Sequence, residues 1–179
     1  LDMVGSYYVN RLGAQGKEAA AAFLEEQLRE HPPAQEVQRH GGDAISDLMD
    51  CLTGNEEYGR AETILRACLE VRPDDPHLIA MAADLAFEMG RNREAIREYG
   101  RLIALHPGDS EPYSKRARAQ RQLGHLKDAL EDMKRAVSLK GSNVKNRLQL
   151  GVLYGLNGRL PEAAEEFTEV LYRTPTLEL

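Results

Sequence analysis

Tryptophan is absent from the 179 residues, aromatic side chains make up only 6% of them, and runs of β-branched residues are missing. Strands are enriched in such residues, so no strand is predicted. Ala, Leu, Glu and Arg dominate the composition instead, and these residues favour helix. A hydrophobic fraction of 42% is enough to bury a continuous core in a chain of this length. We therefore expect an all-α fold.

Long apolar runs are also lacking, since no uninterrupted one is longer than the six residues from Ala19 to Leu24. A membrane-spanning helix needs roughly 18 or more apolar residues, so none is predicted. The two cysteines, Cys51 and Cys68, match neither a disulfide framework nor a zinc-ligand spacing. We interpret them as buried free thiols in a reducing, cytoplasmic setting, and leave a disulfide between them open. Because the sequence begins at Leu1, a leader or anchor outside it also stays open.

Catalytic patterns are missing too. The sequence has no glycine-rich loop that would cradle phosphate, and paired carboxylates such as those of Glu25 and Glu26 are typical of solvated surface. Asp43, Asp47 and Asp50 share one helix face, but they would hold a divalent cation only if other oxygen ligands converged there. We therefore predict no enzymatic activity, no cofactor and no metal site.

An internal repeat is what the sequence does contain. Residues 42–75, 76–109, 110–143 and 144–177 are of equal length and align without a gap, and each predicts two amphipathic helices joined by a tight turn. Three columns of the alignment show the repeat. In the second helices, the alanine column holds Ala61, Ala95, Ala129 and Ala163, and a column of larger side chains holds Leu65, Tyr99, Met133 and Phe167. The ends of the units hold Pro73, Pro107, Gly141 and Pro175. Self-similarity at a fixed period of this length is typical of solenoids.

The last unit carries the clearest motif. Leu150-Gly151-x-x-Tyr154 is followed by Ala163-x-x-x-Phe167 and then by Pro175. This pattern resembles the tetratricopeptide repeat (TPR), with Arg147 where that family has a leading Trp. The resemblance implies a right-handed α-solenoid of helix-turn-helix repeats.

The domain organisation expected from this register has three parts. Residues 1–33 form a degenerate N-terminal helical hairpin, residues 34–41 are an insertion or linker, and residues 42–179 hold the four contiguous repeats.

Short polar residues and glycines punctuate the repeats. Asp75, Asp109 and Asn143 each precede a first helix and are predicted N-caps. Glycine stands at the turn inside three of the hairpins, at positions 90, 124 and 158. Glu56 holds that position in residues 42–75, so we expect its turn to be built differently. Small residues at Ala83, Ala117 and Gly151 face the alanine column of the second helices and predict a close approach of paired helices.

Arg116 breaks the apolar pattern of its column. In a TPR variant that this unit resembles, such an Arg pairs with the acid that precedes the aromatic position of the second helix, here Asp132. We predict a structural Arg116–Asp132 ion pair, because a half-buried guanidinium needs a partner. The alternative is that Arg116 extends to water.

The resemblance also implies a concave groove that is lined by the first helices and holds a peptide or a partner segment. The charged groove positions are Asp43, Asp47, Asp50 and Asp84 in one half, and Lys115, Arg118, Arg121 and Lys145 in the other. The positions between them are His77, Ala80, Met81 and Phe87. A matching ligand would be basic at one end, apolar centrally and acidic at the other, unless these charges are simply solvated.

Other partners and roles follow from the charge and from the last helix. The net charge of −6 and the lack of interleaved basic and aromatic residues disfavour nucleic acid as a partner. The chain could instead be the recognition or regulatory region of a larger enzyme or of a secretion or assembly machine. The second helix of the last unit would expose Ala164, Phe167 and Leu171, so we also expect self-association or coverage by residues outside this sequence.

Overall fold

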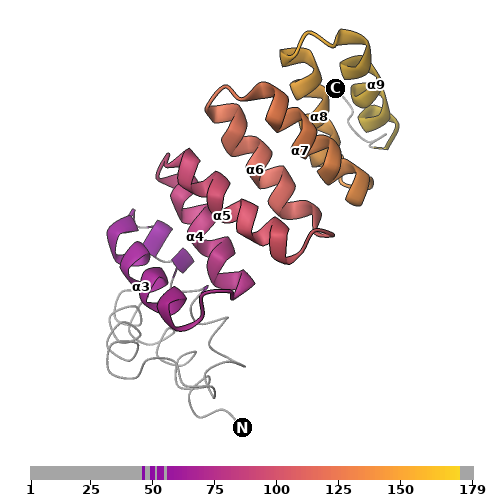
Figure 1. The fold of residues 1–179 in the computed structure, drawn as a ribbon. Coiled ribbons are helices and arrows are strands. Elements are labelled where there is room, and N and C mark those ends of the chain that lie inside the picture. The colour runs from indigo at the N-terminus through magenta and orange to yellow at the C-terminus, as the bar shows by residue number, and fades with distance from the viewer. Residues whose placement is uncertain (1–45, 47–48, 51, 55, 174–179) are drawn as a thin grey trace, which may run out of the picture. The chain divides into compact units, whose positions relative to one another are not determined.

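The computed structural model describes residues 46, 49–50, 52–54 and 56–173, and these contain helices, turns and no strand (Figure 1). The helices are α3 (Tyr58–Val71), α4 (Pro76–Glu88), α5 (Asn92–Leu105), α6 (Ser110–Gln122), α7 (Leu126–Leu139), α8 (Val144–Leu156) and α9 (Leu160–Arg173). The expected hairpin over 1–33, the insertion over 34–41, and residues Asp43, Asp47 and Cys51 lie outside the described residues. The predicted domain division therefore stays a prediction.

The helices recur with the period of the sequence. α4, α6 and α8 each have 13 residues, and they begin one repeat length apart. α3, α5, α7 and α9 each have 14 residues and follow one another at the same interval. Each of the latter helices follows a short turn and completes a helix-turn-helix unit.

The predicted N-caps are confirmed. The Asp109 side chain accepts a hydrogen bond from the backbone N–H of Glu111 at 3.0 Å, and the Asn143 side chain accepts one from that of Asn146 at 3.2 Å. Asp75 accepts from the N–H of His77 at 2.9 Å. These bonds satisfy backbone donors that the first turn of a helix leaves unpaired.

The turn at Glu56 corrects the sequence prediction. Gly90, Gly124 and Gly158 have φ values of 72°, 77° and 75°, and Glu56 has a φ of 62°. The N–H that follows Glu56 bonds to the Leu52 carbonyl at 2.8 Å, as the N–H that follows Gly90 bonds to the Ala86 carbonyl at 2.8 Å. Glu56 therefore makes the same left-handed turn as the glycines, although a side chain disfavours that conformation.

The chain divides into two compact units, residues 1–85 and 86–179. In the first unit the alanine column is represented by Ala61, which is fully buried, and Cys68 is a buried free thiol.

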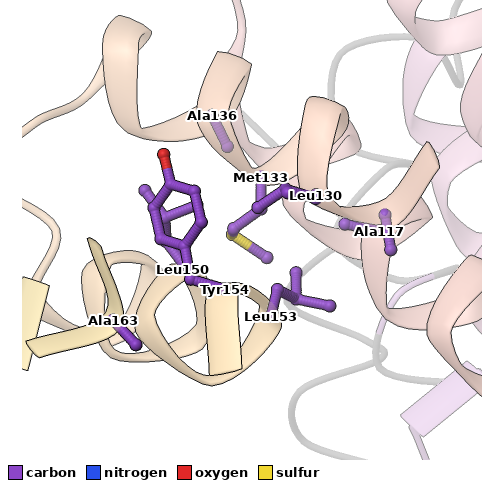
Figure 2. Packing of buried hydrophobic residues seen from close by; sticks show 9 residues of the cluster. Ala117, Leu130, Met133, Ala136, Leu150, Leu153, Tyr154 and Ala163 are labelled. Carbon is purple, nitrogen blue, oxygen red and sulfur yellow. The ribbon is translucent and has the colours of Figure 1, made fainter. Parts of the chain in front are cut away.

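The second unit has a hydrophobic core to which α6, α7, α8 and α9 all contribute (Figure 2). Met133 extends from α7 toward Leu153 and Tyr154 of α8. The buried members are Ala117, Ala129, Leu130, Met133, Ala136, Leu150, Leu153, Tyr154 and Ala163. Because side chains of four helices interlock here, the outer side of each helix has a fixed orientation.

Candidate functional site

The outer side of α8 carries three exposed aliphatic side chains. Leu148, Val152 and Leu156 are 46%, 37% and 52% exposed, and their spacing of four residues places them on one side of the helix. The other side of α8 buries Leu150 and Leu153 in the core. We call Leu148, Val152 and Leu156 the α8 row. It was not predicted from the sequence, and its signal is a second set of aliphatic residues, spaced by four, in a helix that already has a buried side.

The corresponding side of α6 is basic. Arg118 lies one repeat length before Val152, the middle residue of the α8 row, and its guanidinium carbon is 5.0 Å from the centre of the Phe87 ring. This cation–π contact brings two predicted binding residues together. Arg121 is exposed, and Lys115 forms an ion pair with Glu111 at 2.9 Å. This face thus presents Arg121 to water and holds Arg118 against an aromatic ring.

The remaining predicted binding residues lie in residues 1–85 or at the start of α8. The exposed ones are Asp50, His77 and Lys145. The half-buried ones are Met81, whose sulfur accepts a contact from Ser46 Oγ at 3.9 Å, and Asp84. The predicted acidic and basic sets belong to different units, so their arrangement along one groove stays a prediction.

The predicted partners Arg116 and Asp132 contact each other within the α6–α7 hairpin. Arg116 Nε donates to Asp132 Oδ2 and Nη2 donates to Oδ1, both at 2.7 Å. Asp132 is buried and Arg116 is half-buried, and hydrogen bonding to Asp132 raises the pKa of Arg116 above its ordinary value. A bidentate pair of this kind fixes the relative position of two helices.

A second hairpin-bridging pair was not predicted. Arg147 Nη1 donates to Glu166 Oε2 at 3.0 Å, and Arg147 Nε donates to the Gly141 carbonyl at 2.9 Å. Glu166 lies one repeat length after Asp132 and directly precedes Phe167, so it holds the same repeat position as Asp132. The arginine is not equivalent, because the position of Arg116 is held by Leu150 in this repeat, so the rule that predicted the first pair does not predict this one.

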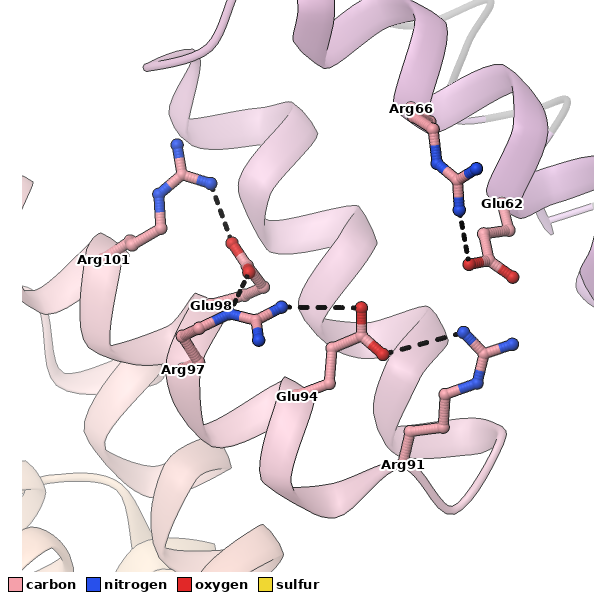
Figure 3. A network of polar contacts seen from close by, with 7 residues as sticks. All are labelled: Glu62, Arg66, Arg91, Glu94, Arg97, Glu98 and Arg101. Carbon is pink, nitrogen blue, oxygen red and sulfur yellow. Dashed lines mark hydrogen bonds and ion pairs between the residues drawn. The ribbon is translucent and has the colours of Figure 1, made fainter.

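Glu98 holds that repeat position on α5, but its partners are on its own helix. Arg97 Nε and Arg101 Nη1 lie 3.0 and 2.8 Å from the two oxygens of its carboxylate. Figure 3 shows Glu98 between these two arginines, and Glu94 between Arg91 and Arg97. The equivalent residues Glu98 of α5, Asp132 of α7 and Glu166 of α9 are therefore all acids that pair with arginine.

The described part of the chain contains no cluster of three or more His, Cys, Asp or Glu side chains that could hold a metal ion. None of the described helices is both long and apolar enough to cross a membrane. Burial raises the pKa of the Cys68 thiol, which keeps it protonated and poorly nucleophilic at neutral pH.

Two family models described as "Tetratricopeptide repeat" match the chain, one over residues 52–120 and the other over residues 114–178. The chain is 31% identical over 130 residues to the Bos taurus protein "Tetratricopeptide repeat protein 36", with 69% of this chain and 67% of the bovine protein covered. The alignment with the Homo sapiens counterpart covers 46% of each chain. The chain thus spans between about half and two thirds of the length of these relatives.

Solved structures show the fold class. The chain is similar to "MamA 41-end from Desulfovibrio magneticus RS-1", with a TM-score of 0.79 at 20% identity over 97% of this chain and 94% of that one. It is also similar to "YrrB: a TPR protein with an unusual peptide-binding site", with a TM-score of 0.73 at 16% identity over 96% and 85%. The expected all-α solenoid class of helix-turn-helix repeats is confirmed.

Proposed function

Because the chain belongs to the tetratricopeptide repeat family, we propose that it is a protein-interaction module that binds a segment of a partner protein against the first helices of its hairpins, without catalysis of its own. The observation that carries the proposal is the α8 row. Leu148, Val152 and Leu156 are exposed in a line on a first helix, and their aliphatic surface is stabilised when another molecule removes it from water.

The neighbouring basic residues set the charge of the partner segment. α6 and α8 share one core, since Ala117 of α6 lies in the same cluster as Leu150 and Leu153 of α8. In a repeat array the corresponding sides of successive first helices face the same way. Arg118 and Arg121 would then flank the α8 row, and they select a partner segment that combines apolar residues with acidic ones.

The family comparisons agree with this function. A peptide-binding site is stated for the structurally similar YrrB in its description, which also calls it a TPR protein. The corresponding site on this chain is proposed from its own exposed residues, because an identity of 16% carries the fold alone.

A random-peptide library displayed on phage and selected on the immobilised full chain tests the proposal. We expect enriched peptides to combine Leu, Ile or Phe with Asp or Glu. Val152→Asp should lower the affinity of a selected peptide by about tenfold or more, because it places a charge in the apolar contact. Arg118→Glu with Arg121→Glu should remove the acidic preference and the salt dependence of binding.

Leu105→Asp is the matched control. Leu105 is an exposed aliphatic residue at the end of α5, a second helix, so it offers the same chemical change away from the proposed surface. Peptide affinity should be unchanged in this variant. If Val152→Asp binds the selected peptides as tightly as the original chain does, the first-helix surface is not the binding site and the proposal is wrong.

A further inference from the structure

α9 has an apolar side that is exposed. Leu160 and Leu171 are 68% and 62% exposed, Ala164 is exposed, and Phe167 is half-buried because one part of its ring covers Gly151. Their spacing of four, three and four residues places all of them on one side of the helix. We call Leu160, Ala164, Phe167 and Leu171 the α9 face.

The equivalent side of α7 is covered by the next helix of the chain, α8. Leu130 and Met133 are buried, and Val137 packs against the same core cluster as Leu150, Leu153 and Tyr154 of α8. The α7 residues that lie one repeat length before those of the α9 face are Leu126, Leu130, Met133 and Val137. A helix packed against this side is therefore the arrangement that the chain uses in its interior, and the α9 face is the equivalent surface left exposed.

The α9 face is complementary to itself. Its spacing is symmetric about the midpoint between residues 165 and 166, so two antiparallel copies of α9 place Leu160 opposite Leu171 of the second copy. The same pairing places Ala164 opposite Phe167 of the second copy. A small residue thus faces a large one on each side of the two-fold axis, which is the alternation that lets two helices pack closely.

Charges do not oppose this pairing. The four residues of the face are uncharged, and Glu162 and Glu169 lie on the opposite side of α9, where each is paired with an arginine. Arg159 Nε donates to Glu162 at 2.8 Å, and Arg173 Nε donates to Glu169 at 2.6 Å. Neither carboxylate therefore enters the proposed contact. A partner rich in charge of one sign is not favoured by this surface.

From this symmetry we infer that two copies of the chain associate through the α9 face, with the two α9 helices antiparallel about a two-fold axis. A second copy fits better than an unrelated helix, because the large and small positions match in this one arrangement. The contact is isologous and uses residues of α9 alone, so we expect self-association and partner binding to be independent.

Sedimentation velocity of the full chain between about 1 μM and 1 mM, a range that includes weak association, tests the inference. We expect a reversible monomer–dimer equilibrium. Leu171→Asp should weaken dimerisation by about tenfold or more, because each dimer contains two such contacts. Since Leu171 is exposed, circular dichroism of this variant should match that of the original chain.

Leu105→Asp, the same type of change at an exposed residue of α5, is the control and should leave the dimer unaffected. A chain that stays monomeric over the whole range overturns the inference. So does a dimer that is unchanged by Leu171→Asp, because its contact would then lie elsewhere.

Cysteine cross-linking tests the antiparallel geometry. A mixture of Leu160→Cys and Leu171→Cys chains should form a disulfide-linked dimer under mild oxidation, above the level seen with the original cysteines alone. Neither variant alone should do so, because residues 160 and 171 are about 17 Å apart along a helix that rises about 1.5 Å per residue. Cross-linking of Leu160→Cys with itself would indicate parallel helices, and a mixture that does not cross-link would exclude the α9 contact. Either result contradicts the inference.

Discussion

The ring of Phe167 occupies the space in which any side chain at Gly151 would have to lie. A Cβ on Gly151 would be 2.6 Å from Phe167 Cε1 and 2.9 Å from Cδ1. Carbon atoms do not approach so closely, so a side chain at residue 151 would force the ring or one of the two helices to move. The sequence indicated a small residue here, and the structure identifies the aromatic ring that requires it.

Gly151→Ala should lower the free energy of unfolding by about 1–3 kcal/mol, because the ring or the helix must shift. Gly155→Ala on the same helix is the control, since a Cβ there meets no atom within 4 Å. It should stabilise the chain by about 0.5–1 kcal/mol through helix propensity. Urea denaturation followed by circular dichroism measures both. Equal effects of the two substitutions would show that the Phe167 contact is not restrictive.

Arg116→Leu should destabilise the chain by about 1–3 kcal/mol, because it leaves the buried Asp132 carboxylate without its partner. Residues 42–75 hold Leu48 and Ile64 at the same two repeat positions. The double variant Arg116→Leu with Asp132→Ile should therefore recover most of the loss. Urea denaturation of the single and double variants gives the coupling energy. A double variant that is no more stable than Arg116→Leu would indicate that the pair does not act as a unit.

Glu56→Gly should stabilise the chain by about 0.5–1 kcal/mol, because a left-handed conformation costs a residue with a side chain about 1–2 kcal/mol and costs glycine almost nothing. Gly124→Glu is the reciprocal change at the equivalent turn, and it should destabilise by a similar amount. Thermal unfolding of both variants checks the sign. A destabilising Glu56→Gly would mean that contacts of the Glu56 side chain outweigh its backbone strain.

The parts of the fold that depend on local sequence were predictable. The helix N-caps and the Ala129 column follow from the residue types and from the period of the repeat, and the Arg116–Asp132 contact follows from a repeat rule. Glu56 was misjudged because its backbone is imposed by the surrounding hairpin and not by its own preference.

The α8 row was missed for a different reason. Leu148 and Leu150 are both leucines two residues apart, and the sequence alone does not say which of them a neighbouring helix covers. α8 has two apolar sides, and only the packing of the folded chain shows which side is buried in the core and which is exposed.

The carbonyl of Gly141 has a consequence for how the array comes apart. It follows α7, and it accepts hydrogen bonds from Arg147 of α8 at 2.9 Å and from Arg173 at the end of α9 at 3.2 Å. Terminal repeats of a solenoid ordinarily fray first, since they have a neighbour on one side only. Here both helices of the last described hairpin are tied to one backbone atom of the preceding unit, so the hairpin cannot open without breaking both bonds. We therefore expect the unfolding of residues 144–173 to be coupled to that of α7.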